Sequence, residues 1–481
     1  MAGLPAEFYV RGRASVREFL PINESEDPPP ERWMQQIWRH QRLRRDLLRS
    51  VQGRTLKVLH PGYWNREPGP DFRQAVLQWE DDPPVTGDIE LDRELTGWTS
   101  HHHAGNPAYA QVILHIIWAP TVPGAERPIL ALQPYLDAPL AELVPWLEFE
   151  AVSRLPPGLL GRCCAPLQDV PDSVVAEFLI QAATDRLHRK AREFAIRARH
   201  VGWDQALWEG LFTALGYKHN GWPLRRLAEV VSEVTDPDPL GWEARLLGLS
   251  GLLPVNPPRH PGAIAQVQQL WDHWWREQER WTDQILPGTV WRLGGIRPAN
   301  HPQRRLALAA RWRAAGTLPA RLLAWLTDEP DSRCGPASTL LDVLQPDGPA
   351  DDFWAHHWTL RSARRPEDLP LLGPARSTDL AVNVILPWLR ARADCGNDRG
   401  LLARVDERFF HWPAGQDNAL LRQARTRLLA GSHQRIPRTA AAQQGLLQIL
   451  RDFCEPAGPL CSACRFPDLV RQAAEAVNGK R

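Results

Sequence analysis

The sequence predicts an α+β protein in which an N-terminal α/β part is followed by a mostly α-helical part. Between residues 55 and 136, several short segments alternate apolar and polar residues with the two-residue period of a β-strand. From about residue 166 onward, apolar residues instead recur every three or four positions, as along one face of an α-helix. With 481 residues, of which 43% are hydrophobic, the chain is long enough for roughly two to four domains with buried cores.

The expected domains follow these changes of pattern. Residues 1–29 end in a run of acids and prolines and are expected to form a polar leader. Residues 30–150 are expected to form the α/β domain, residues 166–450 a tryptophan-rich helical domain, and residues 451–481 a cysteine-containing C-terminal segment.

The α/β domain is predicted to begin with a helix over residues 31–48. Glu31 lies in its first turn, where negative charge is favoured, and its apolar stripe consists of Trp33, Ile37, Trp38 and Leu47. Strands are predicted at residues 55–60, 71–79, 88–95, 111–118 and 128–136, because turns rich in proline and glycine separate these segments.

Four amphipathic segments represent the helical part, at residues 172–198, 262–281, 301–318 and 417–431. Along one side of the second lie Ile264, Val267, Trp271, Trp274 and Trp281. Tryptophans at this spacing are expected to be core residues, not a platform on which nucleic-acid bases stack.

The composition gives the molecule no strong overall charge. The formal net charge is +1, so a surface for nucleic acid would have to be a local patch. No apolar run is long enough to cross a bilayer, and the N-terminus lacks the apolar stretch of a signal peptide. Seven cysteines in a chain without an export signal favour reduced thiols or metal ligands. The expected location is the cytoplasm, without a membrane partner.

The segment TGDIELDREL, residues 86–95, places four acids on one side of a predicted strand: Asp88, Glu90, Asp92 and Glu94. An edge strand with one apolar face and one hydrated, charged face explains this pattern. A cation site is the alternative, because like charges this close repel one another unless water or a cation intervenes.

A cation site on this strand needs a carboxylate from a neighbouring strand. Asp71 lies opposite Glu90 if the turn between them centres on Glu80 and Asp81, and the prolines that follow this turn call for a β-bulge. Carboxylates suit Mg²⁺ or Mn²⁺, which polarise a phosphate oxygen and lower the pKa of an attacking water. Asp71, Glu90 and Asp92 are therefore the candidate catalytic acids, and Asp71 and Glu90 the candidate metal ligands.

Histidines form a second group of candidates. Three adjacent residues, His101, His102 and His103, cannot all face one site, so His101 and His103 are the expected pair. A hydrated loop is one explanation; a phosphate-contacting or proton-transferring pair, with His103 as a candidate catalytic residue, is the other. His115 interrupts an apolar strand and is expected to be a hydrogen-bonded core residue.

The C-terminal segment contains Cys454, Cys461 and Cys464 with a C-x6-C-x2-C spacing. The closer pair can fill two tetrahedral positions on one ion, and proline and glycine in the spacer allow the third thiolate to turn back toward it. Zinc is the first expectation and a [4Fe–4S] cluster the second, with three reduced structural thiols as the alternative.

The segment GIRPANHPQRR, residues 295–305, also has two explanations. Its arginines contact phosphate, or they fix a turn before a helix that Asn300 or His301 caps and that begins at Pro302. The structural explanation is the preferred one.

Several motifs resemble the bacterial domain-of-unknown-function family 2851, over nearly the whole chain. They are GPDF at 69–72, GDIELD at 87–92, GW..HHH at 97–103, AYAQVILHII at 108–117, LGYKHN at 215–220, GIRPANHPQRR at 295–305 and the cysteine cluster near the C-terminus. That family has no established activity to carry over.

The N-terminal part is also similar to the PD-(D/E)XK nuclease superfamily, whose core is a helix, a mixed sheet and a hairpin that bears acids. Pro70 and Asp71 match its first motif and Glu90 to Asp92 its second, except that Asp92 stands where a lysine is expected. This resemblance implies a restriction-endonuclease-like α/β core.

Two functions are compatible with these observations. One is a metal-dependent, nuclease-like protein that acts on DNA or RNA phosphodiesters through Asp71, Glu90 and Asp92, with the helical part presenting the substrate. The other is a non-catalytic nucleic-acid or protein interaction module on a nuclease-like core that has lost its lysine. Clustering of Asp71, Glu90 and a histidine would favour the first, and acids spread over an open face the second.

Overall fold

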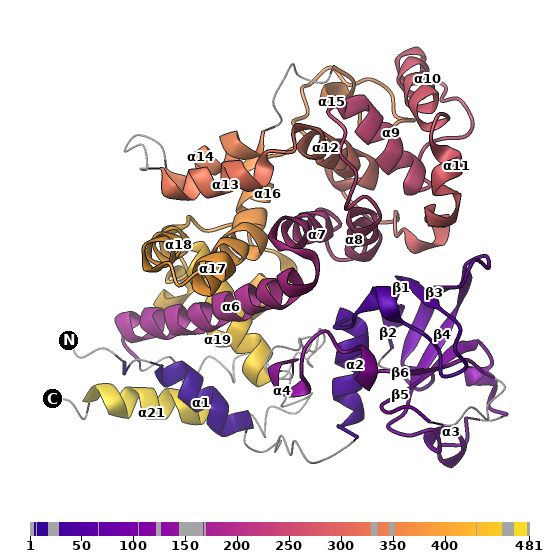
Figure 1. The fold of residues 1–481 in the computed structure, drawn as a ribbon. Coiled ribbons are helices and arrows are strands. Elements are labelled where there is room, and N and C mark those ends of the chain that lie inside the picture. Colours follow the sequence, from indigo (N-terminus) through magenta and orange to yellow (C-terminus); the bar gives the residue numbers. More distant parts are fainter. Residues whose placement is uncertain are drawn as a thin grey trace.

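The computed structural model describes residues 4–5, 7–17, 28–65, 67–103, 105–121, 127–143, 167, 170–328, 335–345, 352–429, 431–454 and 466–478. These residues form an α+β protein, with a mixed sheet in the N-terminal part and helices in most of the remainder (Figure 1). No helix in the described part of the chain is both long enough and apolar enough to cross a membrane.

The sheet contains β1 (Leu56–His60), β2 (Tyr63–Trp64), β3 (Phe72–Trp79), β4 (Val85–Leu91), β5 (Val112–Ile117) and β6 (Ile129–Ala131). Its order is β1-β3-β4-β5-β6, and β2 also pairs with β3. The β1–β3, β2–β3 and β3–β4 pairs are antiparallel, whereas β4, β5 and β6 are parallel. Each of the predicted strands overlaps one of these strands, and β2 lies in a segment that the sequence predicts as a turn.

Helix α2 (Glu31–His40) packs against the sheet through Trp33, Met34, Ile37 and Trp38, all of which are buried in one cluster with sheet residues. The helix is shorter than the predicted 31–48. It ends because Gln41 adopts a left-handed conformation with φ 48°, and its backbone N–H donates to the carbonyls of the last turn. Leu47 follows in a 3₁₀ turn and is 46% exposed, so its place on the predicted apolar stripe is wrong.

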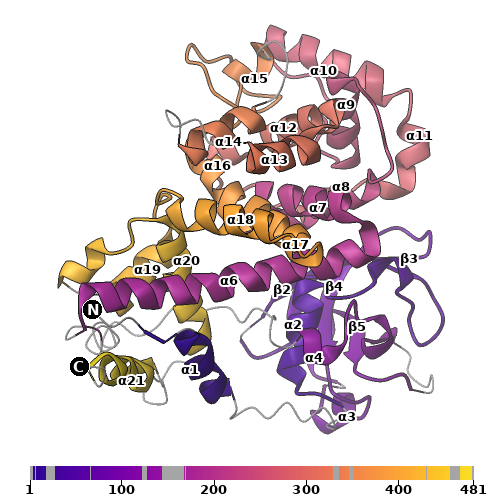
Figure 2. The ribbon, with the colours of Figure 1, turned by 60° about the vertical axis from the view of Figure 1, so that its left-hand side comes forward.

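The helical part is built around α6 (Asp172–Val201), a long helix that runs through the middle of the molecule (Figure 2). It packs against α7, α17 and α20. A Cβ atom at Gly445 of α20 would lie 2.1 Å from the Leu179 carbonyl of α6, so only glycine permits this close approach. Other helices of this part are α7 (Trp203–Leu215), α8 (Gly221–Val230), α9 (Pro239–Leu249), α10 (Pro261–Trp274), α11 (Gln278–Trp281), α12 (Pro302–Ala315), α13 (Leu318–Thr327), α14 (Pro336–Leu344), α15 (Asp352–His356), α16 (Pro374–Leu380), α17 (Leu386–Cys395), α18 (Arg399–His411), α19 (Ala419–Leu428), α20 (Ala440–Ile449) and α21 (Phe466–Asn478).

The tryptophans of this part are largely core residues, as their spacing predicts. Trp242, Trp354, Trp388 and Trp412 are completely buried. The predicted helix 262–281 is interrupted, however, because the chain turns between α10 and α11, where Trp275 is 69% exposed.

The first residues do not form a separate polar leader. They contain α1 (Phe8–Arg17), and Leu4 and Tyr9 are buried in a cluster with residues of α6, α19, α20 and α21. The Tyr9 hydroxyl donates a 2.8 Å hydrogen bond to buried Asp452. Helices α1 and α21 lie near each other at one end of α6 (Figures 1 and 2). The polar sequence of residues 1–29 concealed this packing because α1 contributes few apolar side chains.

The segment GIRPANHPQRR forms a turn before α12, in agreement with the structural explanation. His301 is the N-cap of α12 and accepts from the Gln303 N–H, and Pro302 is the first helical residue. Arg304 is buried and donates to the backbone carbonyls of Trp354, His357, Leu369 and Pro370. Arg304 therefore holds these chain segments together.

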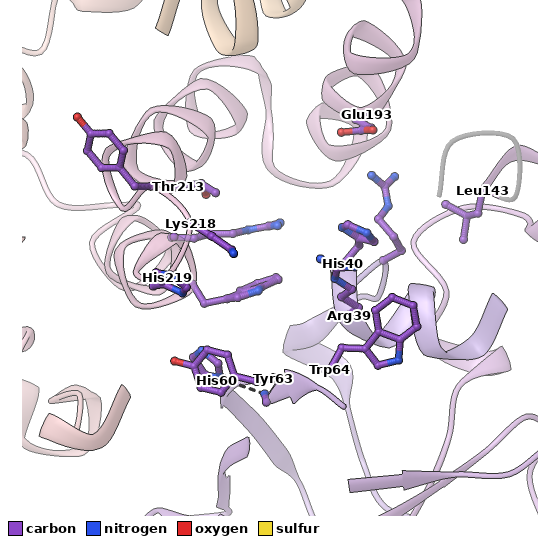
Figure 3. A pocket seen from close by; sticks show the side chains of 16 residues that line it. Arg39, His40, His60, Tyr63, Trp64, Leu143, Glu193, Thr213, Lys218 and His219 are labelled. Carbon is purple, nitrogen blue, oxygen red and sulfur yellow. Dashed lines mark hydrogen bonds between the residues drawn. The ribbon is translucent and has the colours of Figure 1, made fainter. Parts of the chain in front are cut away.

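The α/β part and the helical part share one interface. Leu59 of β1 and Val76 of β3 are buried in the main hydrophobic cluster of the helical part. Arg45, in the turn after α2, forms an ion pair with Glu229 of α8, and Arg225 and Arg226 also contact Glu229. Beside this interface lies a cavity of about 580 Å³, lined by residues of α2, β2, α7 and α8 (Figure 3).

We expect Glu229→Gln to loosen this interface and to lower the free energy of unfolding by about 3 kcal/mol at pH 7. Burial opposes ionisation of Glu229, but Arg45, Arg225 and Arg226 outweigh it and lower its pKa to about 2. A lowered pKa stabilises the fold above the unfolded value of about 4.3, and this stabilisation is lost as the pH falls toward 2. The difference between variant and wild type should therefore shrink by about half near pH 3.

Urea unfolding followed by tryptophan fluorescence measures this difference. Glu233→Gln is the matched control, since Glu233 is exposed. Equal stability of Glu229→Gln and wild type at pH 7 would contradict the prediction that ionised Glu229 stabilises the interface.

Candidate functional site

Strands β3 and β4 bring Asp71 and Glu90 opposite each other. Phe72 pairs with Ile89, and the antiparallel register then places Asp71 beside Glu90. The register shifts between Phe72 and Ala75, where Gln74 has a left-handed φ of 57°. The expected bulge therefore lies in β3, and it preserves the pairing on which the candidate acids depend.

The two carboxylates accept hydrogen bonds from each other's strand. The Asp71 N–H donates to Glu90 Oε2 at 3.1 Å, and the Leu91 N–H donates to Asp71 Oδ2 at 2.9 Å. From α2, Gln35 Nε2 donates to Asp71 Oδ1 at 2.8 Å and to Glu31 Oε1 at 2.9 Å. Helix α2 and strands β3 and β4 thus hold Glu31, Asp71 and Glu90 in one cluster.

The acidic side of β4 is not a hydrated outer face. Glu90 is 6% exposed and Asp92 is 1% exposed. Glu94 lies beyond the end of β4 and is exposed, and Asp88 accepts from the Gln74 N–H, away from the cluster. Only Glu90 and Asp92 of the four predicted acids therefore belong to the site.

Burial and mutual repulsion shift the protonation of these groups. Burial and then the charge of Asp71 raise the pKa of Glu90 to about 9. Burial, together with Glu31 and Asp92, raises the pKa of Asp71 to about 7. Burial and then Asp92 raise the pKa of Glu31. In the absence of a cation the cluster therefore retains protons near neutral pH.

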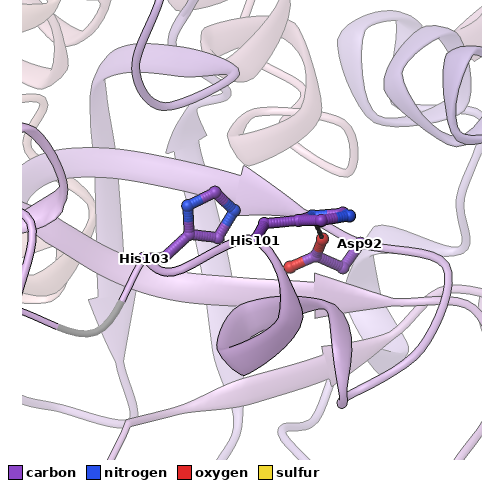
Figure 4. A group of neighbouring side chains, drawn as sticks. All are labelled: Asp92, His101 and His103. Atoms are coloured by element: carbon purple, nitrogen blue, oxygen red, sulfur yellow. Dashed lines mark ion pairs between the residues drawn. The ribbon is translucent and has the colours of Figure 1, made fainter.

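Histidines adjoin the acids on the other side. His115 Nε2 and Asp92 Oδ2 form a 2.9 Å hydrogen bond, and His101 Nδ1 lies 2.9 Å from Asp92 Oδ1. His103 Nε2 lies 3.2 Å from Glu90 Oε1. One ligand atom each from Asp92, His101 and His103 lie within 4.8 Å of one another (Figure 4).

Several of these buried atoms lack well-directed hydrogen bonds. Within the described part of the chain, neither Asp92 Oδ1 nor either ring nitrogen of His103 has a hydrogen-bond partner, although these atoms are buried. Their short contacts to His101 and Glu90 therefore have poor angles. Buried polar atoms without partners call for an explanation, and an ion bound between them supplies one.

The chain approaches Asp92 closely because a glycine begins α3 (Gly97–Ser100). A Cβ atom at Gly97 would lie 2.4 Å from Asp92 Oδ1. The rings of Trp98 and Tyr109 pack against His103, with centroids 5.3 and 4.0 Å from it. These contacts fix the orientation of the imidazole that faces the acids.

The donor set of Asp92, His101 and His103 suits a divalent transition metal. It offers one carboxylate oxygen and two imidazole nitrogens, which favours Zn²⁺, Mn²⁺ or Fe²⁺ over Mg²⁺. Burial lowers the pKa of His103, so its neutral form has a lone pair for a metal at pH 7. The His101 side chain is 56% exposed, which leaves the site accessible from that direction.

The structure brings all four candidate catalytic residues, Asp71, Glu90, Asp92 and His103, into one place. Glu31 and Gln35 also belong to the site, although they are not among the predicted site residues. Their spacing of four residues along α2 is the only sequence signal for them, and that spacing is common on helices. His115 is a hydrogen-bonded core residue, as expected, and its partner is Asp92.

The predicted cysteine site falls only in part within the described residues. Cys454 ends the turn Leu450–Cys454, and Cys461 and Cys464 lie outside the described residues. A zinc ion or [4Fe–4S] cluster on these three cysteines stays a prediction.

The raised pKa values predict how metal-free protein responds to pH. An acid whose pKa is higher in the folded state stabilises the fold fully below its unfolded pKa and loses this contribution as the pH rises to the folded pKa. For Asp71 and Glu90, these folded values are about 7 and about 9. The melting temperature of metal-free protein should therefore fall between pH 5 and pH 9, and it should fall less in Glu90→Gln. Melting scans in a chelator check this expectation; parallel curves for the two proteins would contradict it.

Comparison with known proteins gives one match. The sequence model of the family described as protein of unknown function (DUF2851) matches residues 31–411. No curated protein and no solved structure matches the chain. The match covers the sheet, the acidic cluster and most of the helical part. The chain therefore belongs to the DUF2851 family.

Proposed function

We propose that this protein is a metal-dependent hydrolase of nucleic-acid phosphodiesters, and that the site on α2, β3, β4 and α3 carries the chemistry. One observation carries the proposal: carboxylates from a helix and two strands converge with His103, whose buried ring nitrogens have no hydrogen-bond partner among the described residues. Perturbed acids beside an open metal-binding position are typical of hydrolytic sites.

Each residue has a definite part in this proposal. Asp92, His101 and His103 would hold the cation, and His115 orients the Asp92 carboxylate through its 2.9 Å hydrogen bond. Glu90, 3.2 Å from His103, is placed to accept a proton from water or to return one to the leaving oxygen. A bound cation would polarise a phosphate oxygen and lower the pKa of water.

The missing lysine is the main departure from the nuclease pattern. Asp92 occupies that position, and its Oδ1 atom faces His101. In the superfamily that the N-terminal part resembles, this lysine helps to orient or activate the water. We infer that the histidines of the α3 turn have taken over that part. Lysine is a point charge without a lone pair at neutral pH, whereas neutral imidazole can bind a metal or carry a proton.

The alternative is a non-catalytic interaction module on the same core. It would keep the acids for structural reasons, since Asp71 and Glu90 both accept backbone N–H groups. The clustering of Asp71, Glu90 and His103 favours the catalytic proposal, because a purely structural role leaves the unpartnered atoms of His103 and Asp92 unexplained.

Calorimetric titration with Mn²⁺ and Zn²⁺ separates two possible cation positions. If Asp92, His101 and His103 hold the ion, Asp92→Asn and His101→Ala should each lower the affinity at least about tenfold. Asp71→Asn should have a smaller effect, since both Asp71 oxygens already accept hydrogen bonds. A larger loss in Asp71→Asn with Glu90→Gln would instead place the ion between Asp71 and Glu90, as the sequence predicts. No binding by wild type would contradict both positions.

Cleavage of labelled single-stranded DNA and RNA with Mn²⁺, Mg²⁺ or Zn²⁺ tests the activity. We expect Glu90→Gln and Asp92→Asn to lower the rate at least about 100-fold, because each removes a proton acceptor or a ligand. The matched control is His102→Asn, since His102 is exposed and lies outside the cluster with a left-handed φ of 58° that asparagine tolerates. Equal cleavage by wild type and Glu90→Gln would reject the proposal.

A further inference from the structure

The cavity at the interface of the two parts is rich in cations and aromatic rings. Its volume is about 580 Å³. Arg39, His40 and Trp64 of the α/β part face Lys218 and His219 of the helical part across it (Figure 3). Its charged residues are Arg39, Arg42, Lys218 and Arg225 against one acid, Glu193.

Ion pairs among the described residues leave a positive charge on Lys218 and on the group of arginines around Arg225. Arg42 is paired with Asp137 at 3.1 Å. Arg225, however, belongs to a network of ion pairs in which four arginines share only two acids. The members are Arg45, Arg197, Arg225, Arg226, Glu209 and Glu229. Lys218 is exposed and forms no ion pair within the described residues. The cavity therefore has a surplus of positive charge available to an anion.

Two of the three histidines that line the cavity, His60 and His219, have lowered pKa values, chiefly because they are buried. Burial and then Arg292 lower the pKa of His60 to about 4. Burial, Lys218 and Arg292 lower the pKa of His219. Both imidazoles are therefore neutral hydrogen-bonding groups at pH 7, and the fixed charge comes from arginine and lysine.

Aromatic rings alternate with these cations. Arg39 lies 5.3 Å from the Trp64 ring centroid, and Arg225 lies 5.2 Å from that of Trp222. Tyr217, on the same wall as Lys218, is 39% exposed. Basic residues interleaved with aromatic rings are typical of grooves that bind single-stranded nucleic acid.

One face of α2 connects the cavity with the acidic cluster. Glu31, Gln35 and Arg39 are four residues apart, so they form one stripe along the helix, and all three are half-buried. Glu31 and Gln35 belong to the cluster, and Arg39 lines the cavity. At 1.5 Å per residue, the stripe is about 12 Å long.

Strand β2 makes the same connection beside α2, where Arg39 lies over the Trp64 ring. Trp64 lines the cavity and pairs with Phe72, the residue after Asp71. The next residue, Asn65, donates its N–H to the Asp71 carbonyl at 2.6 Å. The two regions are therefore continuous along α2 and β2.

We propose that a single-stranded polynucleotide binds along this face, with backbone phosphates in the cationic cavity and bases against its aromatic rings, and extends over the α2 stripe to the acidic cluster. A length of about 12 Å corresponds to about three or four nucleotides at 3.4 Å each, so a mononucleotide cannot span it. A paired duplex cannot present its base faces to aromatic rings. The inference rests on the proposed function for the acidic end and adds the substrate class and its binding path.

Fluorescence anisotropy with a labelled 20-nucleotide oligothymidylate in EDTA tests binding without any cleavage. We expect Lys218→Glu and Arg39→Gln each to weaken binding about tenfold. Each should also reduce the slope of log affinity against log salt concentration by about one. The matched control is Arg399→Glu, since Arg399 is exposed at the start of α18, away from the cavity. Circular dichroism of each variant verifies that the fold is retained.

Binding by both cavity variants that equals wild type would overturn the inference, as would tighter binding of duplex than of single strand. A parallel titration with oligouridylate tells whether DNA or RNA is preferred. Loss of binding in the variants, with no cleavage by wild type under any metal, would support the cavity as a binding site for single-stranded nucleic acid. It would reject only the hydrolase proposal.

Discussion

Negative charge held out of water is the constraint on which the α/β part depends. Glu90 and Asp92 are almost completely buried, and Asp71 and Glu31 lie beside them. Such a group of like charges persists only where hydrogen-bond donors, protons or a cation offset the repulsion. The structure supplies donors from the backbone of β3 and β4 and from Gln35. The bulge at Gln74 preserves this arrangement, because without it the strand register would carry Asp71 away from Glu90.

The sequence was sufficient to predict the strands, the pairing of Asp71 with Glu90 and the common side of Glu90 and Asp92, because strand alternation and turn position are local properties. The mixed sheet was implied only by the resemblance to the nuclease superfamily. The sequence was not sufficient to predict the burial of the side with Glu90 and Asp92, since the covering residues Gly97 and Trp98 reach it only in the folded chain. Alternation tells which residues share a face, but it does not tell whether water or protein lies against that face.

The helical part bears on function through its contact with the sheet. Leu59 and Val76 are buried among its residues, and Glu229 is held by arginines from both parts. This docking gives the cavity its second wall, with Lys218 and His219. No single segment of sequence contains this combination, because residues far apart in the chain form its two halves, as the separation of 184 between Arg45 and Glu229 illustrates. The cavity therefore depends on the interface between the two parts and does not exist in either part alone.

The position of α1 has a consequence for the order in which the molecule folds. Tyr9 is joined to Asp452 across 443 positions, and Gly12 lies against Leu469 of α21. The α/β part is thus inserted between α1 and the helices with which α1 packs. During synthesis, α1 leaves the ribosome long before those partners exist, while the sheet has nearly all of its own contacts close by in sequence. The sheet can therefore assemble early, and closure of the cluster around Tyr9 must be among the last events, when the two distant segments finally meet.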